Sequence, residues 1–318
     1  FAPGLTPSRK CALDVNGSLS SHSAVVSCAG RNGGFLSLSG ALDPKKLEWH
    51  GSLSDFILQS EFAQTITLGS AVPLSFNLKT LEGRAGATSL RGQGSLELSE
   101  ARFSPKALDF KAAIKALSLD AFKKLLPTKW DLSGTADGQV SLAGSPSSPK
   151  LDAAITVSGA RIAAPDAAFA FDRLKLGATG GHGGITFDLD AAIKRGGGNI
   201  LASLTVGDPR GAKRLSGTLK VDSLALSRLR HLGGGFNELD GTARADLRFG
   251  GTLSHPLIFG SAGASGSAEP RYDIGRVDSF RFDLAASGQG GTLNGSVGMN
   301  QGSVTVLALN MKLPFSSV

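Results

Sequence analysis

The side chains that could do chemistry in this chain are scattered, and their spacing does not form a catalytic or metal-binding pattern. No histidine has a second histidine or a carboxylate at metal-ligand spacing. Most stand beside Gly or Ser, so we expect surface turn positions for His22, His50, His182, His231 and His255. Asp188 and Asp190 alternate along one strand pattern, which places both on its solvated face and gives no acid–base couple.

Known catalytic and nucleotide-binding motifs are missing from the sequence. The glycine clusters fall between strand patterns and not before a helix, which argues against a phosphate-binding or dinucleotide-binding loop. The segment SAGASGSAEP lacks the Gly-x-Ser-x-Gly elbow of serine hydrolases. Enzymes usually carry reactive residues in loops, whereas the loops here hold Gly, Pro and Ser. The sequence therefore predicts a protein that is not an enzyme, with no cofactor and no metal.

The two cysteines, Cys11 and Cys28, flank a predicted hairpin formed by ALDVNGSL and SAVVSCAG. Their spacing could place them near each other across paired strands, which would suit a disulfide in an oxidising compartment. Two small buried thiols are the alternative. The sequence leaves both open.

The charged residues do not indicate a nucleic-acid partner. The formal net charge is +7, but the basic residues are spread along the chain, with the tightest groups at Lys45–Lys46, Lys123–Lys124 and Lys213–Arg214. No aromatic residues interleave with them as a base-stacking platform would require. We predict a solvated outer face, with weak attraction to anionic lipid headgroups as the alternative. No window approaches the run of about 18 apolar residues that a membrane helix needs.

Period-two alternation dominates the chain and predicts antiparallel strands with one apolar and one polar face. The clearest cases are PLSFNLK, LDFKAAI, ITFDLDAAI, RFDLA and SVTVLALN. Glycine-rich breakers separate these strands, and the 43 glycines suit a sheet with many tight turns. Two short helices interrupt the pattern, in LSLDAFKKLLP and in LALSRLRHLGGG. The sequence predicts an all-β meander with short helical inserts.

A repeat with an offset of 107 residues links two parts of the chain. Gly134, Val140 and Leu142 of DLSGTADGQVSLAGSPSSPK match Gly241, Leu247 and Phe249 of ELDGTARADLRFGGTLSHPL, and the same offset relates the two helices. Repeats of this kind predict a stacked, elongated architecture. We divide the chain into a segment 1–130 that ends in the first helix, a repeat unit 131–237 that ends in the second, and a partial unit 238–318.

These patterns resemble the TamB family, within the wider AsmA-like group of long periplasmic β proteins of Gram-negative bacteria. The resemblance rests first on the segment LSLDAFKKLLPTKWDLSGTADGQVSLAGSPSSPKLDAAITVSGARI. It shows a short helix ending in Leu-Pro, then a strand, a Gly-Ser turn and a strand that begins with Pro. The others are LSLSGALDPKKLEWHGSLSDFILQSEFAQTITLGSAVPLSF and the second copy of the repeat at Glu238–Phe259. The chain lacks the family's N-terminal membrane helix and its conserved C-terminal domain, so we expect a middle fragment.

The resemblance implies a curved sheet folded like a taco, with a hydrophobic groove along its length. It implies a periplasmic bridge, anchored in the inner membrane, that conducts phospholipid to the outer membrane. It also implies a link to outer-membrane protein assembly and an Omp85-type outer-membrane barrel (TamA-like) as a partner. Phospholipid acyl chains would contact the alternating inward residues, which we predict to be Leu74, Phe76, Leu108, Phe110, Val140, Leu142, Ile155, Val157, Ile185, Phe187, Leu189, Leu247, Phe249, Phe280 and Phe282.

The residues themselves do not determine what covers the apolar face of the sheet. A sheet with one apolar face must bury it, either against a second sheet in a closed sandwich or against a ligand in an open channel. A strand of about 6 residues spans about 20 Å, wide enough for an acyl chain in one leaflet of about 15 Å. The alternatives to a lipid groove are a β-rich chaperone-like module that binds outer-membrane protein strands by edge pairing and a structural or adhesive module.

Overall fold

The alternation of apolar and polar residues produces strands through most of the described chain. This computed structural model describes residues 10–29, 33–60, 64–126, 130–164, 167–208, 211–228, 236–271, 276–299 and 304–314. The chain forms two compact units, one of residues 1–126 and 135–153, the other of residues 127–134 and 154–318. We call them unit 1 and unit 2. The predicted all-β class, with curved antiparallel sheet, is confirmed.

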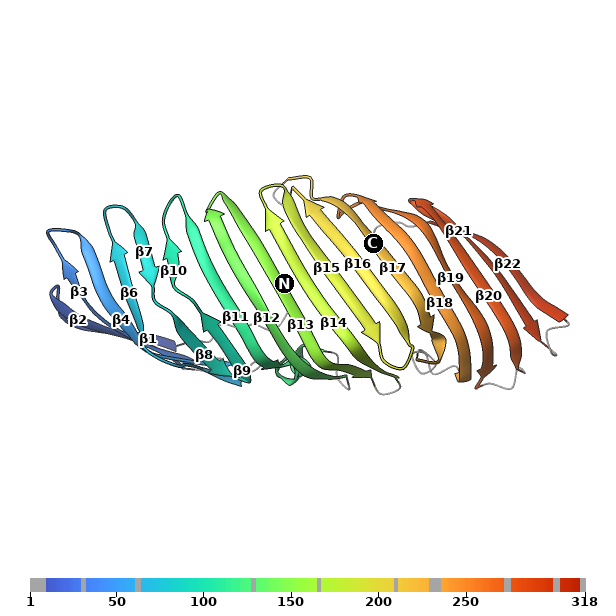
Figure 1. The fold of residues 1–318 in the computed structure, drawn as a ribbon, viewed down its shortest axis with the longest axis horizontal. Coiled ribbons are helices and arrows are strands. Elements are labelled where there is room, and N and C mark those ends of the chain that lie inside the picture. Colours follow the sequence, from blue (N-terminus) through green and yellow to red (C-terminus); the bar gives the residue numbers. More distant parts are fainter. Residues whose placement is uncertain are drawn as a thin grey trace. The chain divides into compact units, whose positions relative to one another are not determined.

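Unit 1 is an antiparallel sheet of long and short strands (Figure 1). Its strands are β1 (Lys10–Ser18), β2 (Ser21–Ala29), β3 (Gly34–Asp43), β4 (Glu48–Ser60), β5 (Gln64–Leu68), β6 (Val72–Asn77), β7 (Glu82–Ala85), β8 (Thr88–Gly92), β9 (Gly94–Leu98), β10 (Ala101–Phe103) and β11 (Leu108–Ser118), with parts of β12 (Asp131–Ser145) and β13 (Ser148–Ala164). The first four strands pair in chain order, as the hairpin prediction for the cysteine segment required.

Between β4 and β11, three long strands are each interrupted midway. One end of β4 pairs with β6 and the other with β5, while β11 pairs with both β10 and β9. The intervening short strands pair as β6–β7–β10 and as β5–β8–β9. The interruptions fall at residues 69–71, 86–87 and 99–100, so they line up across neighbouring strands. Such a line of breaks bends a sheet, because the backbone ladder is disrupted at the same level in each strand.

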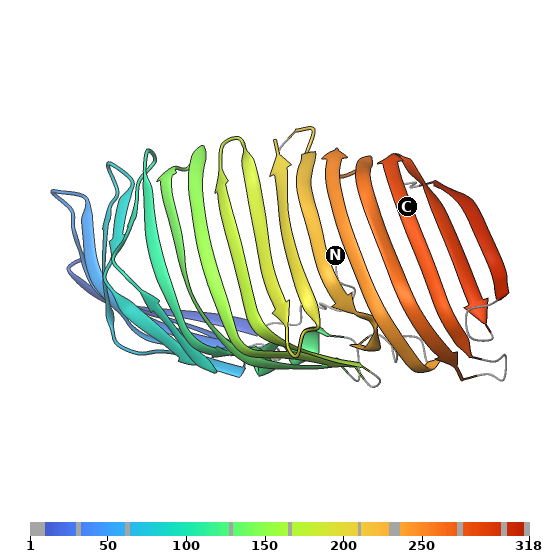
Figure 2. The ribbon, with the colours of Figure 1, turned by 45° about the vertical axis from the view of Figure 1, so that its right-hand side comes forward.

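Unit 2 is a regular meander in which most strands pair with the next one in the chain. Its strands are the remainder of β12 and β13, then β14 (Ala167–Gly181), β15 (Gly184–Ile193), β16 (Gly198–Gly207), β17 (Arg214–Ala225), β18 (Phe236–Gly251), β19 (Pro256–Pro270), β20 (Val277–Gly288), β21 (Gly290–Met299) and β22 (Val304–Pro314). The antiparallel register runs without a crossover from β14 to β22. Figure 2 shows these strands side by side and bowed along their length.

Both predicted helices are present as short 3-10 turns. η1 (Leu119–Leu125) begins after Ser118, whose hydroxyl accepts a hydrogen bond from the backbone N–H of Asp120. η2 (Leu226–Arg228) occupies the start of the second prediction, and the rest of that prediction (residues 229–235) lies outside the described residues. None of the helices among the described residues has the length and apolar character needed to cross a membrane.

The backbone repeats the 107-residue offset found in the sequence. Ala116 in β11 and Ser223 in β17 both have positive φ, of 49° and 53°, at bulges that precede η1 and η2. Gly134 and Gly241 have φ of 132° and 127°, and Gly144 and Gly251 have φ of 98° and 80°. Backbone states that L side chains rarely adopt therefore recur at three matched positions. The chain division at residues 130 and 237 stays a prediction.

The two units have no large buried core. Among the described residues, no large side chain has a relative exposure below 2%, and no polar or charged residue is buried. More than half of the buried apolar residues are alanines, such as Ala136, Ala160 and Ala191. Each sheet is therefore held mainly by its strand pairing and by side-chain contacts along its faces.

We predict that Gly241→Ala destabilises unit 2 by about 2 kcal/mol or more, because Gly241 has a φ of 127° and an added Cβ would overlap the backbone carbonyl of Ser265. Gly181→Ala is the matched control, since its Cβ would meet nothing within 4 Å. Thermal unfolding followed by circular dichroism compares the two. Equal melting of both variants would contradict this assignment.

Candidate functional site

The strand register of unit 2 aligns large apolar residues on one face of its sheet. Phe187 on β15 lies opposite Leu204 on β16, and Leu204 lies opposite Gly217 on β17. Gly217 in turn lies opposite Phe249 on β18. Because paired residues share a face, we define the unit 2 apolar face by the rows that continue this register, which include Ile185, Leu189, Val206, Leu215, Leu219, Leu247, Ile258, Phe280, Phe282, Leu284, Leu293, Val297, Leu307, Leu309 and Met311.

This face is only partly covered. Phe187 is 49% exposed, Leu176 on β14 is 42% exposed and Met311 on β22 is 43% exposed. Leu176 belongs to the same face because it lies opposite Leu189. Contiguous apolar side chains left this open normally mark a binding surface in a soluble protein.

Unit 1 carries a groove on its own apolar face. Five of the predicted lining residues come together there, and the groove has a volume of about 510 Å³. The register explains their meeting, because Phe110 lies opposite Leu142, and Phe76 lies opposite Trp49. The apolar lining consists of Leu74, Phe76, Leu108, Phe110 and Leu142, joined by Trp49, Phe103, Ala85 and Ala101.

A second groove of about 760 Å³ adjoins the first, since Trp49 and Phe76 line both. Its other walls are Val15, Leu19, Leu42 and Leu78 together with the imidazole of His22. The indole Nε1 of Trp49 donates a hydrogen bond of 2.8 Å to Nε2 of His22, so both polar atoms have a partner. The pair keeps the groove wall apolar without leaving an indole N–H unsatisfied.

The structure joins Cys11 and Cys28 in a disulfide across the hairpin of β1 and β2. The two residues are directly opposed in the register, with their Cα atoms 4.1 Å apart. Cys11 alternates with Leu13 and Val15, so the disulfide lies on the same face as the groove residue Val15. It fixes the register of the hairpin that supplies one wall of the groove.

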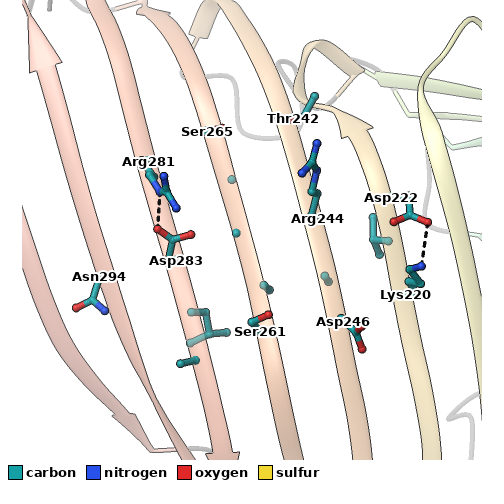
Figure 3. Close-up of a pocket in the computed structure, with 17 residues that line it drawn as sticks. Lys220, Asp222, Thr242, Arg244, Asp246, Ser261, Ser265, Arg281, Asp283 and Asn294 are labelled. Atoms are coloured by element: carbon teal, nitrogen blue, oxygen red, sulfur yellow. Dashed lines mark hydrogen bonds and ion pairs between the residues drawn. The ribbon is translucent and has the colours of Figure 1, made fainter.

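The opposite face of unit 2 is charged. It holds a trough of about 640 Å³ to which β19 contributes only small residues, such as Ser261, Gly263 and Ser265. Figure 3 shows the longer side chains of Arg281 and Arg244 on the strands to either side. Nε of Arg281 lies 2.7 Å from a carboxylate oxygen of Asp283, and this hydrogen bond raises the pKa of Arg281 above its usual value. The ion pairs on this face are solvent-exposed and contribute little stability.

Some of the charged groups on this face pair with one another. Arg173 and Asp190 pair across β14 and β15 at 2.9 Å, and Lys220 lies 3.8 Å from Asp222. Asp188 and Asp190 both lie on this face, as predicted. The described residues hold no group of three His, Cys, Asp or Glu residues that could bind a metal ion.

The turn assignment for the histidines is wrong for two of them. His22 lies on β2 and is half-buried against Trp49, and His50 lies on β4, 3.5 Å from Glu48. His22 stands between two serines and His50 precedes a glycine, which suggested turns, but both residues belong to strands that pair with other strands. His182 and His255 do lie in connections between strands, and His231 lies outside the described residues.

The other predicted lining residues, Val140, Ile155 and Val157, are not among the lining residues of the two grooves of unit 1. Val140 shares the apolar face of unit 1 because it lies opposite Ala112. Val157 on β13 is buried and Ile155 is half-buried. Sequence analysis missed Trp49, Phe103 and His22 as groove residues. Phe103 lies on β10, which has only three residues, too few for alternation to be visible. For Trp49, the alternation of leucine and serine in LSLSGALD, on the strand that pairs with it, was a usable signal.

Chemically, these surfaces can bind hydrocarbon and little else. Most of the side chains that define them are aliphatic or aromatic. Burying apolar area releases about 25 cal/mol per Å² whatever the shape of the ligand, so such a surface selects for apolarity and not for a particular molecule.

A family model described as TamB, N-terminal domain, matches residues 6–263. No solved structure matches the chain.

We predict that replacing both cysteines, as Cys11→Ala with Cys28→Ala, loosens the β1–β2 hairpin. The disulfide closes a sequence separation of 17 residues, and closing a loop of that length stabilises a fold by about 3 kcal/mol. Hydrogen exchange of residues 11–29 should accelerate in the variant, and in the unaltered chain after reduction. Exchange in β20 and β21 is the internal control. Unchanged protection of the hairpin would show that strand pairing alone holds it.

Proposed function

Because the chain belongs to the TamB family, we propose that its apolar faces conduct phospholipid from the inner to the outer membrane. Proteins of this family are non-enzymatic modules of the cell envelope that act in outer-membrane assembly and lipid transport. The observation that supports lipid as the cargo is the open apolar face, on which Phe187 remains 49% exposed while the opposite face carries paired charges.

The proposed mechanism is passive. Acyl chains lie on the apolar face, and each buried CH₂ contributes about 0.8 kcal/mol. The apolar residues of neighbouring strands lie opposite one another. An acyl chain that moves from β15 to β16 therefore leaves its contact with Phe187 and contacts Leu204, without crossing polar side chains. Adjacent sites of similar affinity allow movement in either direction, and the supply of lipid sets the net flow.

The same family membership supports proposals for partners and location. We propose that the parent chain acts in the periplasm, is anchored in the inner membrane and works with an Omp85-type outer-membrane barrel of the TamA kind. Assembly of outer-membrane proteins would then depend on the lipid that reaches the outer membrane. In this proposal the groove of unit 1, which Phe76, Phe110 and Leu142 line, also binds acyl chains.

Photo-crosslinking tests the cargo directly. A photoreactive residue at Phe187 or Leu142 should capture phospholipid in cells, because both side chains lie on the apolar faces. The neighbouring positions Asp188 and Ser141 are matched controls, since alternation places them on the opposite face. Capture of protein alone would favour the chaperone-like alternative. Equal lipid capture at all four positions would rule out a one-sided track.

A charge on the apolar face should reduce lipid carriage without unfolding the sheet. Phe187→Glu places a carboxylate on a side chain that is already half exposed, so the expected loss of stability is below about 1 kcal/mol. Lipid copurified with the variant should fall several-fold in native mass spectrometry. Asp188→Lys is the control on the charged face and should carry lipid at the wild-type level. Normal lipid content in Phe187→Glu would contradict the proposal.

A further inference from the structure

Three basic residues lie near one another at one end of β15 and β16. Lys194 and Arg195 stand in the turn that joins these strands, and Arg228 ends η2. Nη2 of Arg228 donates to the carbonyl of Lys194 at 3.4 Å, and the backbone N–H of Ala225 donates to the carbonyl of Gly197 at 3.1 Å. These two bonds seat η2 on the turn. We call Lys194, Arg195 and Arg228 the basic cluster.

The basic cluster is not neutralised within the described part of the chain. None of its three members has a carboxylate partner there. The neighbouring carboxylates are Asp222, which lies 3.8 Å from Lys220, and Asp172, at the bulge of β14. Neither makes a described ion pair with the cluster. The positive charge of this group is therefore available to an external anion.

The basic cluster directly adjoins the apolar face of unit 2. Ile193, the residue before Lys194, is 5% exposed and alternates with Ala191 and Leu189 on that face. Leu226 of η2 is also buried, at 7% exposure. From Ile193 back to Phe187 the strand runs about 20 Å, similar to the depth of about 15 Å that one leaflet's acyl chains occupy. The basic cluster thus lies at the end of an apolar stretch of β15 that is about as long as an acyl chain.

We propose that the basic cluster binds the phosphodiester of a phospholipid headgroup while the acyl chains of that lipid lie along Leu189 and Phe187. The inference rests on the proposed function and deepens it by naming where the headgroup is held. The planar guanidinium of an arginine can donate two parallel hydrogen bonds to phosphate oxygens, and Lys194 adds a flexible point charge. Binding should weaken at high salt, because the Debye length falls from about 10 Å at 0.1 M to about 3 Å at 1 M.

The test compares two lipids that differ in the phosphate alone. The chain is incubated with equal amounts of phosphatidylglycerol and diacylglycerol of matched acyl chains, and bound lipid is measured by native mass spectrometry. The wild-type chain should prefer phosphatidylglycerol by about tenfold, the size expected from a few partly screened charges near an anionic group. Lys194→Gln with Arg195→Gln and Arg228→Gln should abolish most of this preference but retain total lipid.

A matched control removes the same charge elsewhere in unit 2. Lys213→Gln with Arg214→Gln and Arg248→Gln alters basic residues toward the opposite ends of β17 and β18, and it should keep the preference. Because Arg228 also holds the turn, Lys194→Gln with Arg195→Gln provides a second variant that leaves this contact intact. Its preference should fall at least threefold.

The outcomes separate the two proposals. If the wild-type chain binds neither lipid, the proposed function fails. If it binds both lipids equally, or if the control loses the preference as the cluster variant does, only the headgroup site is overturned. Titration with inorganic phosphate alone shows whether the basic cluster is a site for a free anion and not for a phospholipid headgroup. Phosphate binding at the cluster that matches the lipid in strength would overturn the headgroup assignment.

Discussion

The structure depends on one constraint, the two-residue period of β-strands maintained over a long antiparallel register. Alternation places Phe187 on one face and Asp188 on the other, and antiparallel pairing carries that separation from strand to strand. A slip of one residue anywhere would move the apolar residues of that strand to the charged face. The glycine turns and the positive-φ positions preserve the register, because they let each strand end and return without a shift.

The repeated bulges show how a sheet with this register also curves. Ala116 and Ser223 each add an unpaired residue shortly before a 3-10 turn, and a glycine on a paired neighbouring strand faces each bulge. An added Cβ on Gly94 would lie 2.5 Å from the Cα of Leu117, and one on Gly198 would lie 2.8 Å from the Cα of Leu224. The missing side chain lets the bulged strand approach its neighbour closely. Bulge and glycine thus form one device for bending the sheet, used in both units.

The sequence predicted the strands and the faces well, because both follow from alternation within a single segment. It predicted η1 and the start of η2 from helical spacing, although the length of three to seven residues favours a 3-10 turn. It could not predict the line of breaks across β5 to β10, since each break is a few ordinary residues whose alignment appears only once the strands pair. His22 was misassigned for the same reason. Its partner Trp49 lies 27 residues away and reaches it through two strand pairings.

The scarcity of buried side chains connects stability to the proposed cargo. A sheet whose buried apolar residues are largely alanines gains little from a core, and its large side chains stay half in water. Any apolar ligand that covers them adds the burial energy that a second sheet supplies in a sandwich. Ligand binding to the folded state alone stabilises it by RT ln(1 + [L]/Kd). Under the proposed function, bound lipid would therefore stabilise the folded sheet, and the same open face that admits the lipid would make the sheet depend on it.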